Sequence, residues 1–374
     1  MFFNDSLAMG GTEVLLVDLL NHLAAKGCVV TLLLPEYSER NILQEKISPQ
    51  VSIKYLYSDK ISYLKRKIQD NIMIFFPRIY ARRKGLKESD YDEVVCFKES
   101  FFAGVLSVMK IPKMLWIHNI IYKRQYEIRS LKEGLAVWLN KKHYDLFDKV
   151  ICVSDVAKQS YISVLHNGKL PEQNIKVLYN AIDLTKVKDR SKEPIEDLPQ
   201  GRTNFILITR TSPEKRIDRL INAALRLKGE GYNFHVYIIG SRLDTPEMGD
   251  NLSLKGLGNT ITLMGYLDNP FPYILQCNWS LCVSERESFS LSLLESMALK
   301  TPVITTDCGG PSDIVDGGRY GLLVKNSGEG VYEGMKVVLD DPSLSVKYSE
   351  DLDKAVSRFD YNGWLDSVDR LLGV

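Results

Sequence analysis

The sequence contains no apolar run that approaches the roughly 20 residues needed to span a membrane as a helix. Its N-terminus also lacks the basic region followed by an apolar stretch that marks a secretory signal. These absences favour a cytoplasmic protein, and a peripheral position at the inner face of the membrane stays open.

The six cysteines form no C-x-x-C pair and show no spacing typical of a metal site. Most of them lie in apolar stretches that resemble strands, so we expect reduced side chains in the core. They are Cys28, Cys96, Cys152, Cys277, Cys282 and Cys308.

Neither sign of charge dominates, because 48 basic residues face 47 acidic ones and leave a net charge of +1. No overall field then draws the protein to nucleic acid, and we predict no nucleic-acid partner. Two nucleotide-binding signatures are absent as well, namely G-x-x-x-x-G-K-[ST] and a G-x-G-x-x-G that follows a strand. The sequence therefore gives little support to two classes of protein, the P-loop enzymes and the simple dinucleotide dehydrogenases.

Short apolar strand candidates alternate with helical patterns along the whole chain. This alternation is typical of parallel sheets covered by helices on both faces. With 374 residues, 45% of them apolar, the chain is long enough for two such domains. The predicted fold class is α/β, with two Rossmann-like, doubly wound domains. We predict strands at 29–34, 51–57, 94–97, 114–117, 150–153, 177–179, 205–209, 235–239, 261–264, 279–283 and 302–305.

A polar stretch at 186–202 separates the two series of strands. We therefore expect an N-terminal Rossmann-like domain over 1–182 and a C-terminal Rossmann-like domain over 183–357. The last helix, about 358–374, carries Trp364 as a packing anchor and could pack back on the first domain.

The first helix is expected over 12–26, with Thr12 as its N-cap and Gly27 as its stop. Phe2 and Phe3 stand so close to the first glycine pair that almost no length remains for a first strand. This suggests that a few residues are missing upstream.

The most informative stretch leaves a buried strand and enters an amphipathic helix, and it carries Glu287 and Glu295 eight positions apart. The first glutamate would lie at the crevice above the strand ends. Free backbone amides of the first helical turn, at Phe289, Ser290 and Leu291, would point at an anion there. The alternative is two solvated glutamates beside an ordinary helix.

A second stretch follows the first strand of the second domain and holds Arg210 and Lys215. An arginine fork and a lysine point charge can converge on one phosphate pair. A basic surface turn is the alternative, and it is weaker at a strand end of a doubly wound domain.

In the first domain, His118 ends an apolar strand where a ligand crevice is expected, although a core histidine would explain it too. Gly10 and Gly11 open the first helix and let backbone approach a ligand closely; the alternative is a tight turn that needs positive φ. His22 and His166 we interpret as structural.

Together these stretches resemble glycosyltransferase family 4, whose members have the GT-B fold, with two Rossmann-like domains facing each other across a cleft. The likeness covers nearly the whole chain. It implies that Arg210 and Lys215 bind the donor diphosphate, that Glu287 lies near the sugar hydroxyls, and that Glu295 binds the ribose.

The resemblance also assigns roles in the first domain, where Gly10 and Gly11 form the opening loop and His118 borders the donor sugar. In the second domain, the family's Gly-Gly-Pro segment after a strand matches 309–311. The family's usual loop has glycine where this chain has serine, at 288 and 290, which could tighten the space beside the sugar and leaves the donor sugar open.

By resemblance the reaction is a retaining transfer of a hexose-type sugar from a nucleotide-diphosphate sugar. The acceptor would be a saccharide or a lipid-linked saccharide, in cell-surface polysaccharide or glycoconjugate synthesis. No Asp or Glu of the first-domain motifs stands out as a general base, and in the mechanism proposed for the family the donor's own phosphate takes the acceptor proton. The protein then mainly stabilises charge on the leaving diphosphate, and domain closure would exclude water.

The donor base is expected to be uridine on family frequency, and Tyr266, after a predicted strand, could border it. We expect no cofactor and no essential metal. The sequence Asp90-Tyr91-Asp92 resembles the D-x-D metal pair of another glycosyltransferase fold, but it precedes a predicted strand instead of following one.

From residue 60 to residue 87 the chain holds nine basic residues against Asp70 alone, with aromatic residues interleaved. Such a segment can lie on an anionic membrane surface and would then form the acceptor side. A solvated helix with an aromatic core stripe is the alternative. The cations that we assign to this side are Lys65, Arg66, Lys67, Arg82, Arg83 and Lys84.

Two other functions stay open at this stage. One is a non-catalytic GT-B-like partner that binds a saccharide beside another enzyme, although such a partner need not keep a diphosphate site. The other is a sugar-nucleotide epimerase, which would need acid and base groups around the sugar.

Overall fold

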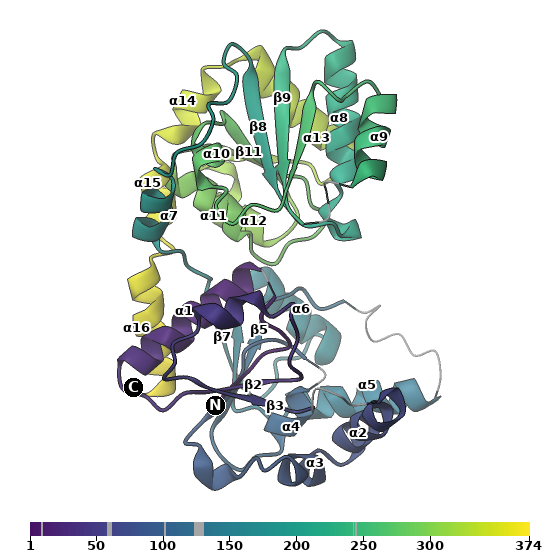
Figure 1. Ribbon diagram of the computed structural model, residues 1–374, viewed down its shortest axis with the longest axis vertical. Helices are drawn as coiled ribbons and strands as arrows, with labels where there is room; N and C mark the ends of the chain where they lie inside the picture. The colour runs from purple at the N-terminus through teal and green to yellow at the C-terminus, as the bar shows by residue number, and fades with distance from the viewer. Residues whose placement is uncertain (9, 58–61, 101, 123–130, 242, 244) are drawn as a thin grey trace. The chain divides into compact units, whose positions relative to one another are not determined.

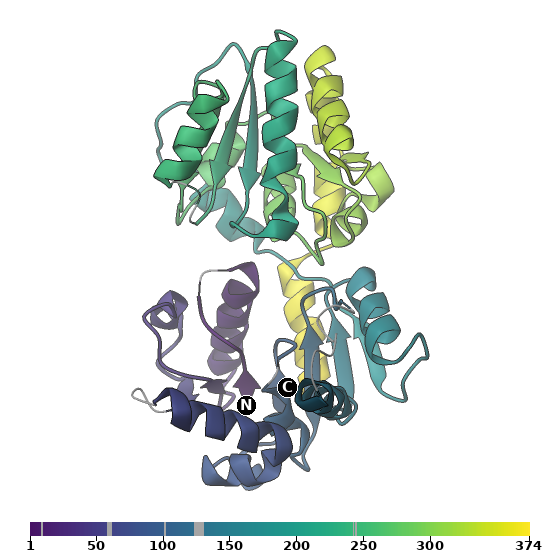
Figure 2. The same ribbon diagram turned by 90° about the vertical axis from the view of Figure 1, so that its right-hand side faces the viewer.

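A computed structural model describes residues 1–374 except 9, 58–61, 101, 123–130, 242 and 244. The chain forms two compact units. Unit 1 comprises Met1–Tyr179 and Val368–Val374, and unit 2 comprises Asn180–Ser367. Each unit holds one sheet with helices packed against it (Figures 1 and 2).

Unit 1 contains a seven-stranded sheet in the order β3-β2-β1-β4-β5-β6-β7, with every neighbouring pair parallel. Its strands are β1 (Phe2–Phe3), β2 (Thr31–Leu34), β3 (Ser52–Tyr55), β4 (Val94–Cys96), β5 (Lys113–Ile117), β6 (Lys149–Cys152) and β7 (Asn174–Val177). Its helices are α1 (Gly11–Ala25), η1 (Ile42–Lys46), α2 (Tyr63–Phe75), α3 (Pro77–Arg83), η2 (Glu88–Asp90), α4 (Ala103–Ser107), α5 (Leu131–Tyr144) and α6 (Asp155–Leu165).

Unit 2 contains a six-stranded sheet in the order β10-β9-β8-β11-β12-β13, again parallel throughout. Its strands are β8 (Thr203–Ile208), β9 (Phe234–Ile239), β10 (Ile261–Gly265), β11 (Trp279–Cys282), β12 (Val303–Thr306) and β13 (Leu322–Val324). Its helices are α7 (Leu184–Arg190), η4 (Pro213–Lys215), α8 (Ile217–Gly229), α9 (Pro246–Leu254), α10 (Phe271–Leu275), α11 (Leu291–Ala298), α12 (Gly310–Ile314), η5 (Asp316–Gly318), α13 (Gly328–Asp340), α14 (Leu344–Ser349) and α15 (Leu352–Ser357).

The strand order of each unit reverses at one place. In unit 1 the reversal lies between β1 and β4, and in unit 2 it lies between β8 and β11. In an open parallel sheet, the loops that leave the two strands at such a point diverge to opposite faces and leave a crevice at the carboxyl ends. The sheets therefore define two places for ligands, one in each unit.

The α/β, doubly wound fold class is confirmed, and ten of the eleven predicted strands match observed strands closely. The strand predicted at 177–179 lies earlier, at Asn174–Val177, because β7 is an edge strand with exposed residues at alternate positions and a weak apolar pattern. Two short strands escaped prediction, the half-buried edge strand β13 and the two-residue strand β1. Despite its length, β1 is central and pairs with β2 and β4.

The predicted N-cap of the first helix was wrong. Helix α1 begins at Gly11, and its N-cap is Gly10, which has an extended backbone and offers no side-chain cap. The predicted stop is confirmed, since Gly27 follows the helix with φ of 86°.

The last helix, α16 (Tyr361–Leu372), has the predicted position, and Trp364 is buried as expected. Its end belongs to unit 1, where Asp369 accepts hydrogen bonds from His22 of α1 (3.1 Å) and from Lys26, the C-cap of α1 (2.9 Å). His22 is thus a structural residue. All six cysteines are free thiols, and all except Cys28 are buried. Within the described residues, no helix is long and apolar enough to cross a membrane.

Candidate active site

The two loops at the reversal point of unit 2 are joined by an ion pair. Lys215 ends the short helix after β8, and its ammonium donates to the Glu287 carboxylate in the loop after β11. Both side chains are only about 15% exposed. Burial acts to lower the pKa of Lys215, but the charge and hydrogen bond of Glu287, together with Cys282, raise that pKa overall. The sequence-predicted lysine and the first predicted glutamate therefore form one charged pair.

Backbone contacts reinforce this junction. The amide of Glu285 donates to the carbonyl of Glu214 across the two loops (2.8 Å). Beneath them, buried Arg219 of α8 donates to Asn326 (2.6 Å), and Asn326 in turn donates to the Glu285 carbonyl (2.8 Å). Arg219 and Asn326 escaped prediction because neither stands in a recognisable motif, and only the fold brings them below the loop.

The glycine pair after β12, Gly309 and Gly310, fixes the backbone of the loop that carries Glu287. The Glu287 amide donates to the Cys308 carbonyl (3.0 Å), and the Gly310 amide donates to the Glu287 carbonyl (2.8 Å). Gly309 has φ of 118°, and a Cβ on Gly310 would overlap the Ser288 carbonyl. Both positions therefore need glycine, which holds the Glu287 backbone in register with the neighbouring loop.

Arg210 follows β8 and is exposed. Its guanidinium makes no hydrogen bond or ion pair with any residue that the structure describes. Its positive charge nevertheless acts to lower the pKa of Lys215, so the two cations lie in the same neighbourhood. Arg210 is thus the cation that an anionic ligand would find unpaired.

The observed helix start lies two residues after the predicted one near Phe289. Helix α11 begins at Leu291, Ser290 is its N-cap, and no side chain caps its first turn. The Phe289 ring is buried against Phe359, with 5.5 Å between ring centroids. Only the backbone of Phe289 could therefore reach a ligand.

Glu295 lies one turn into α11 and is half-buried. Burial raises the pKa of its carboxyl to about 7, although the Arg190 guanidinium acts to lower it. Arg190 also pairs with Asp268 (2.8 Å), which interacts with Tyr266 and helps to raise the pKa of that phenol. Tyr266 is partly exposed after β10, so Glu295 and Tyr266 share the neighbourhood of Arg190.

In unit 1, His118 directly follows β5 and is only 4% exposed. Its ring lies 4.8 Å from the Phe97 ring and is stacked 6.1 Å from Trp116. Burial, with help from the Lys98 charge, lowers the pKa of His118 to about 3. The imidazole is therefore neutral at any ordinary pH and cannot serve as a cationic acid.

Two carboxylates of unit 1 escaped prediction. Glu99, just after β4, accepts from the amide of His118 (2.8 Å) and from the Asn119 side chain, and burial raises its pKa. Asp5, after β1, accepts from Ser100 (2.5 Å), and burial raises its pKa too. These acids follow the two strands at the reversal point. Glu99 could have been found from its position after the strand predicted at 94–97.

A third carboxylate explains the glycine at the start of α1. Glu13 is buried, pairs with Lys98 (3.3 Å) and lies where a Cβ on Gly10 would be. The alternative of a positive-φ turn is excluded, because Gly10 is extended at φ of −172° and Gly11 is helical. Gly10 therefore leaves room for the Glu13 carboxylate beside the helix start.

The basic segment forms α2 and α3, and Lys60 and the Tyr63 side chain lie outside what the structure describes. Lys65, Lys67, Arg82 and Arg83 are exposed. In contrast, Arg66 pairs with Glu36 (2.8 Å) and lies 5.0 Å from the Tyr57 ring. Lys84 lies 5.6 Å from that ring and 5.4 Å from the Tyr80 ring. Arg66 and Lys84 therefore hold the segment against unit 1, and only the other four face solvent.

These two sheets and their loops define a GT-B-type, two-unit glycosyltransferase. The family model "Glycosyltransferase Family 4" matches residues 9–186, and "Glycosyl transferases group 1" matches residues 188–356. The chain belongs to this family, group 1 of the glycosyltransferases, family 4, and it is an enzyme that uses nucleotide-sugar donors.

Two relatives illustrate the likeness. An N-acetylgalactosaminyltransferase from Campylobacter jejuni, which acts on a diphospho-undecaprenol-linked saccharide, is 26% identical over 58% of this chain and 58% of its own length. The capsular polysaccharide biosynthesis glycosyltransferase CapM of Staphylococcus aureus is 28% identical over 52% of this chain and 50% of its own length. The chain thus spans about half the length of these two relatives.

The fold extends further than the sequence likeness. Anabaena HepE, solved in complex with UDP and glucose, matches 100% of this chain with 98% of its own at a TM-score of 0.75 and 17% identity. At that identity the match establishes the shared fold.

The ion pair leads to a first prediction. Lys215→Met should lower the free energy of unfolding by about 1–3 kcal/mol, because it leaves the Glu287 carboxylate half-buried without its partner. Lys215→Met/Glu287→Gln should recover most of that loss, as measured by urea unfolding. Equal losses in the single and the double variant would show that the pair adds no specific stability.

Proposed function

We propose that this enzyme transfers a hexose-type sugar, with retention at the anomeric carbon, from a UDP-sugar to a saccharide or lipid-linked saccharide. Unit 2 binds the donor, and unit 1 supplies the acceptor side. The product belongs to cell-surface polysaccharide or glycoconjugate synthesis.

One observation carries the donor half of this proposal. At the reversal point of unit 2, the Lys215–Glu287 pair and the unpaired Arg210 gather beside a helix start that no side chain caps. Two cations match the two phosphates of a nucleotide diphosphate, and the carboxylate beside them matches sugar hydroxyls. A basic surface turn would not explain why Lys215 is held at low exposure by a carboxylate from another loop.

The same groups suit the chemistry of the leaving diphosphate. As the bond to the sugar breaks, negative charge grows on the phosphate oxygens, and fixed positive groups stabilise it more in the transition state than in the bound donor. Arg210 and Lys215 supply that charge. Loss of one such contact typically costs about 3–4 kcal/mol of barrier.

Three carboxylates near the reversal point of unit 1 are candidates for acid–base chemistry. Asp5, Glu13 and Glu99 are each held by a hydrogen bond or an ion pair with Ser100, Lys98 or the His118 backbone. Such contacts suit positioning groups. This supports a mechanism in which the donor's own phosphate takes the acceptor proton. Neutral His118 would then border the sugar, together with Gly10 and Gly11.

For the nucleoside end of the donor, Glu295 and Tyr266 are the candidates. An ionised Glu295 can accept both ribose hydroxyls, and the partly exposed Tyr266 ring offers a face for the base. The complex of Anabaena HepE with UDP and glucose supports uridine as the base.

The proposed acceptor class follows from two relatives of this chain. The Campylobacter relative is named for a diphospho-undecaprenol acceptor, and CapM is named for capsular polysaccharide synthesis. Family membership argues against a non-catalytic partner and an epimerase, because both would leave the family's transfer reaction unused.

The donor site is tested by thermal shift with UDP, GDP, ADP and a panel of UDP-sugars. We expect UDP compounds to raise the unfolding temperature of the wild type, and Arg210→Ala/Lys215→Ala to abolish that rise because the diphosphate loses both cations. Lys255→Ala/Lys347→Ala is the matched control, since it removes two exposed cations outside the loops after β8 and β11. If the folded wild type responds to no nucleotide, the assigned donor site is wrong; a response to GDP or ADP instead would change the base.

The raised pKa of Glu295 leads us to expect that donor affinity depends on pH. With a pKa of about 7, its carboxyl is mostly protonated at pH 6 and mostly ionised at pH 8, and only the ionised form accepts both ribose hydroxyls. Affinity for the UDP-sugar that binds should therefore rise about tenfold as the pH rises over that range. Calorimetric titrations of the wild type and Glu295→Gln check this, and the same slope in both would rule out Glu295 as the titrating group.

A further inference from the structure

Two buried cysteines meet beside the Lys215–Glu287 pair. Cys282 ends β11, and Cys308 lies two residues after the end of β12, the neighbouring parallel strand. Their side chains are 7% and 5% exposed, and the Cys308 thiol donates a hydrogen bond to the Cys282 sulfur. The two sulfur atoms are therefore already in contact, although the residues are well separated in the sequence.

The backbone holds the two thiols at this place. The loop that leaves Cys282 runs along the segment after β12, where Glu287 and Gly309 form a parallel bridge. The Glu287 amide donates to the Cys308 carbonyl (3.0 Å), so Cys308 is tied to that same loop. A disulfide needs neighbouring backbones whose side chains face each other, and these contacts provide them.

The surroundings make one of the two sulfurs reactive. The hydrogen bond from Cys308 lowers the pKa of the Cys282 thiol, and the Lys215 charge acts in the same direction against burial and the Glu287 charge. The same hydrogen bond, together with burial, raises the pKa of Cys308, which therefore stays protonated. A thiolate beside a thiol is the arrangement that reacts with a peroxide and then closes to a disulfide.

The remaining cysteines differ from this pair. Burial raises the pKa of Cys96, Cys152 and Cys277, which keeps these thiols protonated and slow to react. Cys28 is partly exposed and lies in unit 1, just after α1. Oxidation within unit 2 should therefore begin at Cys282.

We propose that Cys282 and Cys308 form a reversible disulfide on exposure to hydrogen peroxide, and that this bond weakens binding of the donor. The Cys282 thiolate attacks one peroxide oxygen, the O–O bond breaks, and a sulfenic acid forms while hydroxide leaves and is protonated to water. The Cys308 thiol then attacks that sulfur, the S–S bond forms, and the sulfenic oxygen leaves as a second water. The two sulfurs together lose the two electrons that reduce the peroxide, and a dithiol can reverse the reaction.

The disulfide would act on the donor site through the segment after β12. Drawing two sulfurs from hydrogen-bond contact to a covalent bond of about 2 Å requires this segment to move. It has little freedom, because a Cβ on Gly310 would already overlap the Ser288 carbonyl. The Glu287 backbone must follow the Cys308 carbonyl, which displaces its carboxylate. This effect rests on the donor site proposed above, whereas formation of the disulfide does not.

Formation of the disulfide is tested by peptide mapping of the full-length protein after treatment with hydrogen peroxide. We expect a cross-linked peptide pair that contains Cys282 and Cys308 and that dithiothreitol separates. Cys308→Ser should stop at the sulfenic acid of Cys282, which dimedone traps. Cys28→Ser is the matched control and should form the cross-link as the wild type does. If the folded wild type forms no cross-link, or one that involves Cys28 instead, the proposal is overturned.

Calorimetric titration with the UDP-sugar that binds measures the consequence for the donor. Affinity of the wild type should fall about tenfold on oxidation and return with dithiothreitol, as for loss of one hydrogen bond to a charged group. Cys282→Ser should bind equally well before and after peroxide. Equal affinities of the oxidised and reduced wild type would overturn the effect on the donor. A wrong donor site would show already in the reduced protein, and the peptide map decides the disulfide independently.

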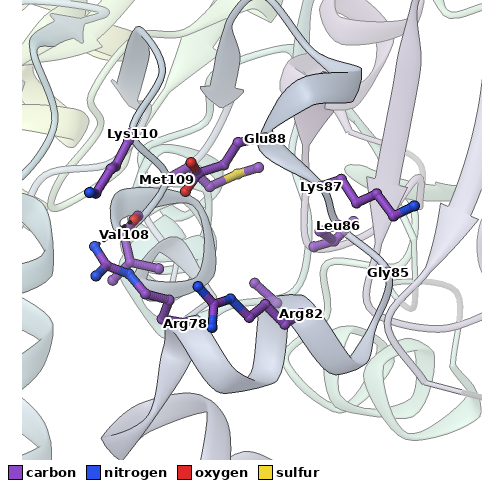
Figure 3. A pocket seen from close by; sticks show the side chains of 10 residues that line it. Arg78, Arg82, Gly85, Leu86, Lys87, Glu88, Val108, Met109 and Lys110 are labelled. Carbon is purple, nitrogen blue, oxygen red and sulfur yellow. Dashed lines mark hydrogen bonds between the residues drawn. The ribbon is translucent and has the colours of Figure 1, made fainter.

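Oxidation of methionine is the competing effect of peroxide. Met109 lines a cavity of about 460 Å³ in unit 1, beside Arg78 and Arg82, and Figure 3 shows its sulfur there. A sulfoxide at this place would make an apolar side chain polar. Met109→Leu removes that sulfur and should keep both the cross-link and the loss of donor affinity. Disappearance of the loss in this variant would assign it to the methionine and overturn the role of the disulfide.

Discussion

The reversal of strand order between β8 and β11 is the constraint on which the rest of the candidate site depends. The loops after β8 and β11 diverge there, although they leave neighbouring strands. The Lys215–Glu287 ion pair then joins residues of these two loops. Buried Arg219 and the close approach of Gly310 leave the Glu287 loop little freedom. A donor would therefore meet a charged surface that is already assembled, and preorganised charge is what makes electrostatic stabilisation effective.

Unit 1 repeats this strand order but uses its reversal point differently. The loops after β1 and β4 bring in carboxylates, and most of these are engaged with neighbouring polar groups. His118 stays neutral because burial between aromatic rings makes its charged form unfavourable. Two sheets of the same topology thus present opposite chemistry, cationic in unit 2 and largely carboxylate with one lysine in unit 1.

The sequence allowed the fold class and the buried strands to be predicted, because parallel strands covered on both faces are continuous apolar runs. Edge strands such as β7 and β13 were displaced or missed, since their exposed sides interrupt that pattern. Arg210, Lys215 and Glu287 of the candidate site were singled out because charged residues after a buried strand are conspicuous. Residues such as Arg219, which act from a helix beneath a loop, leave no such signal and need the three-dimensional arrangement.

The carboxylate beside Lys215 also has a consequence for selectivity. Glu287 is the counter-ion of Lys215, so a simple inorganic anion must compete with a carboxylate that is tethered at a fixed place. A ligand that brings a phosphate for the lysine and hydroxyl donors for the glutamate satisfies both partners at once. If the pair binds the donor as proposed, it would favour a sugar diphosphate, which satisfies both side chains, over free phosphate, which satisfies only the lysine.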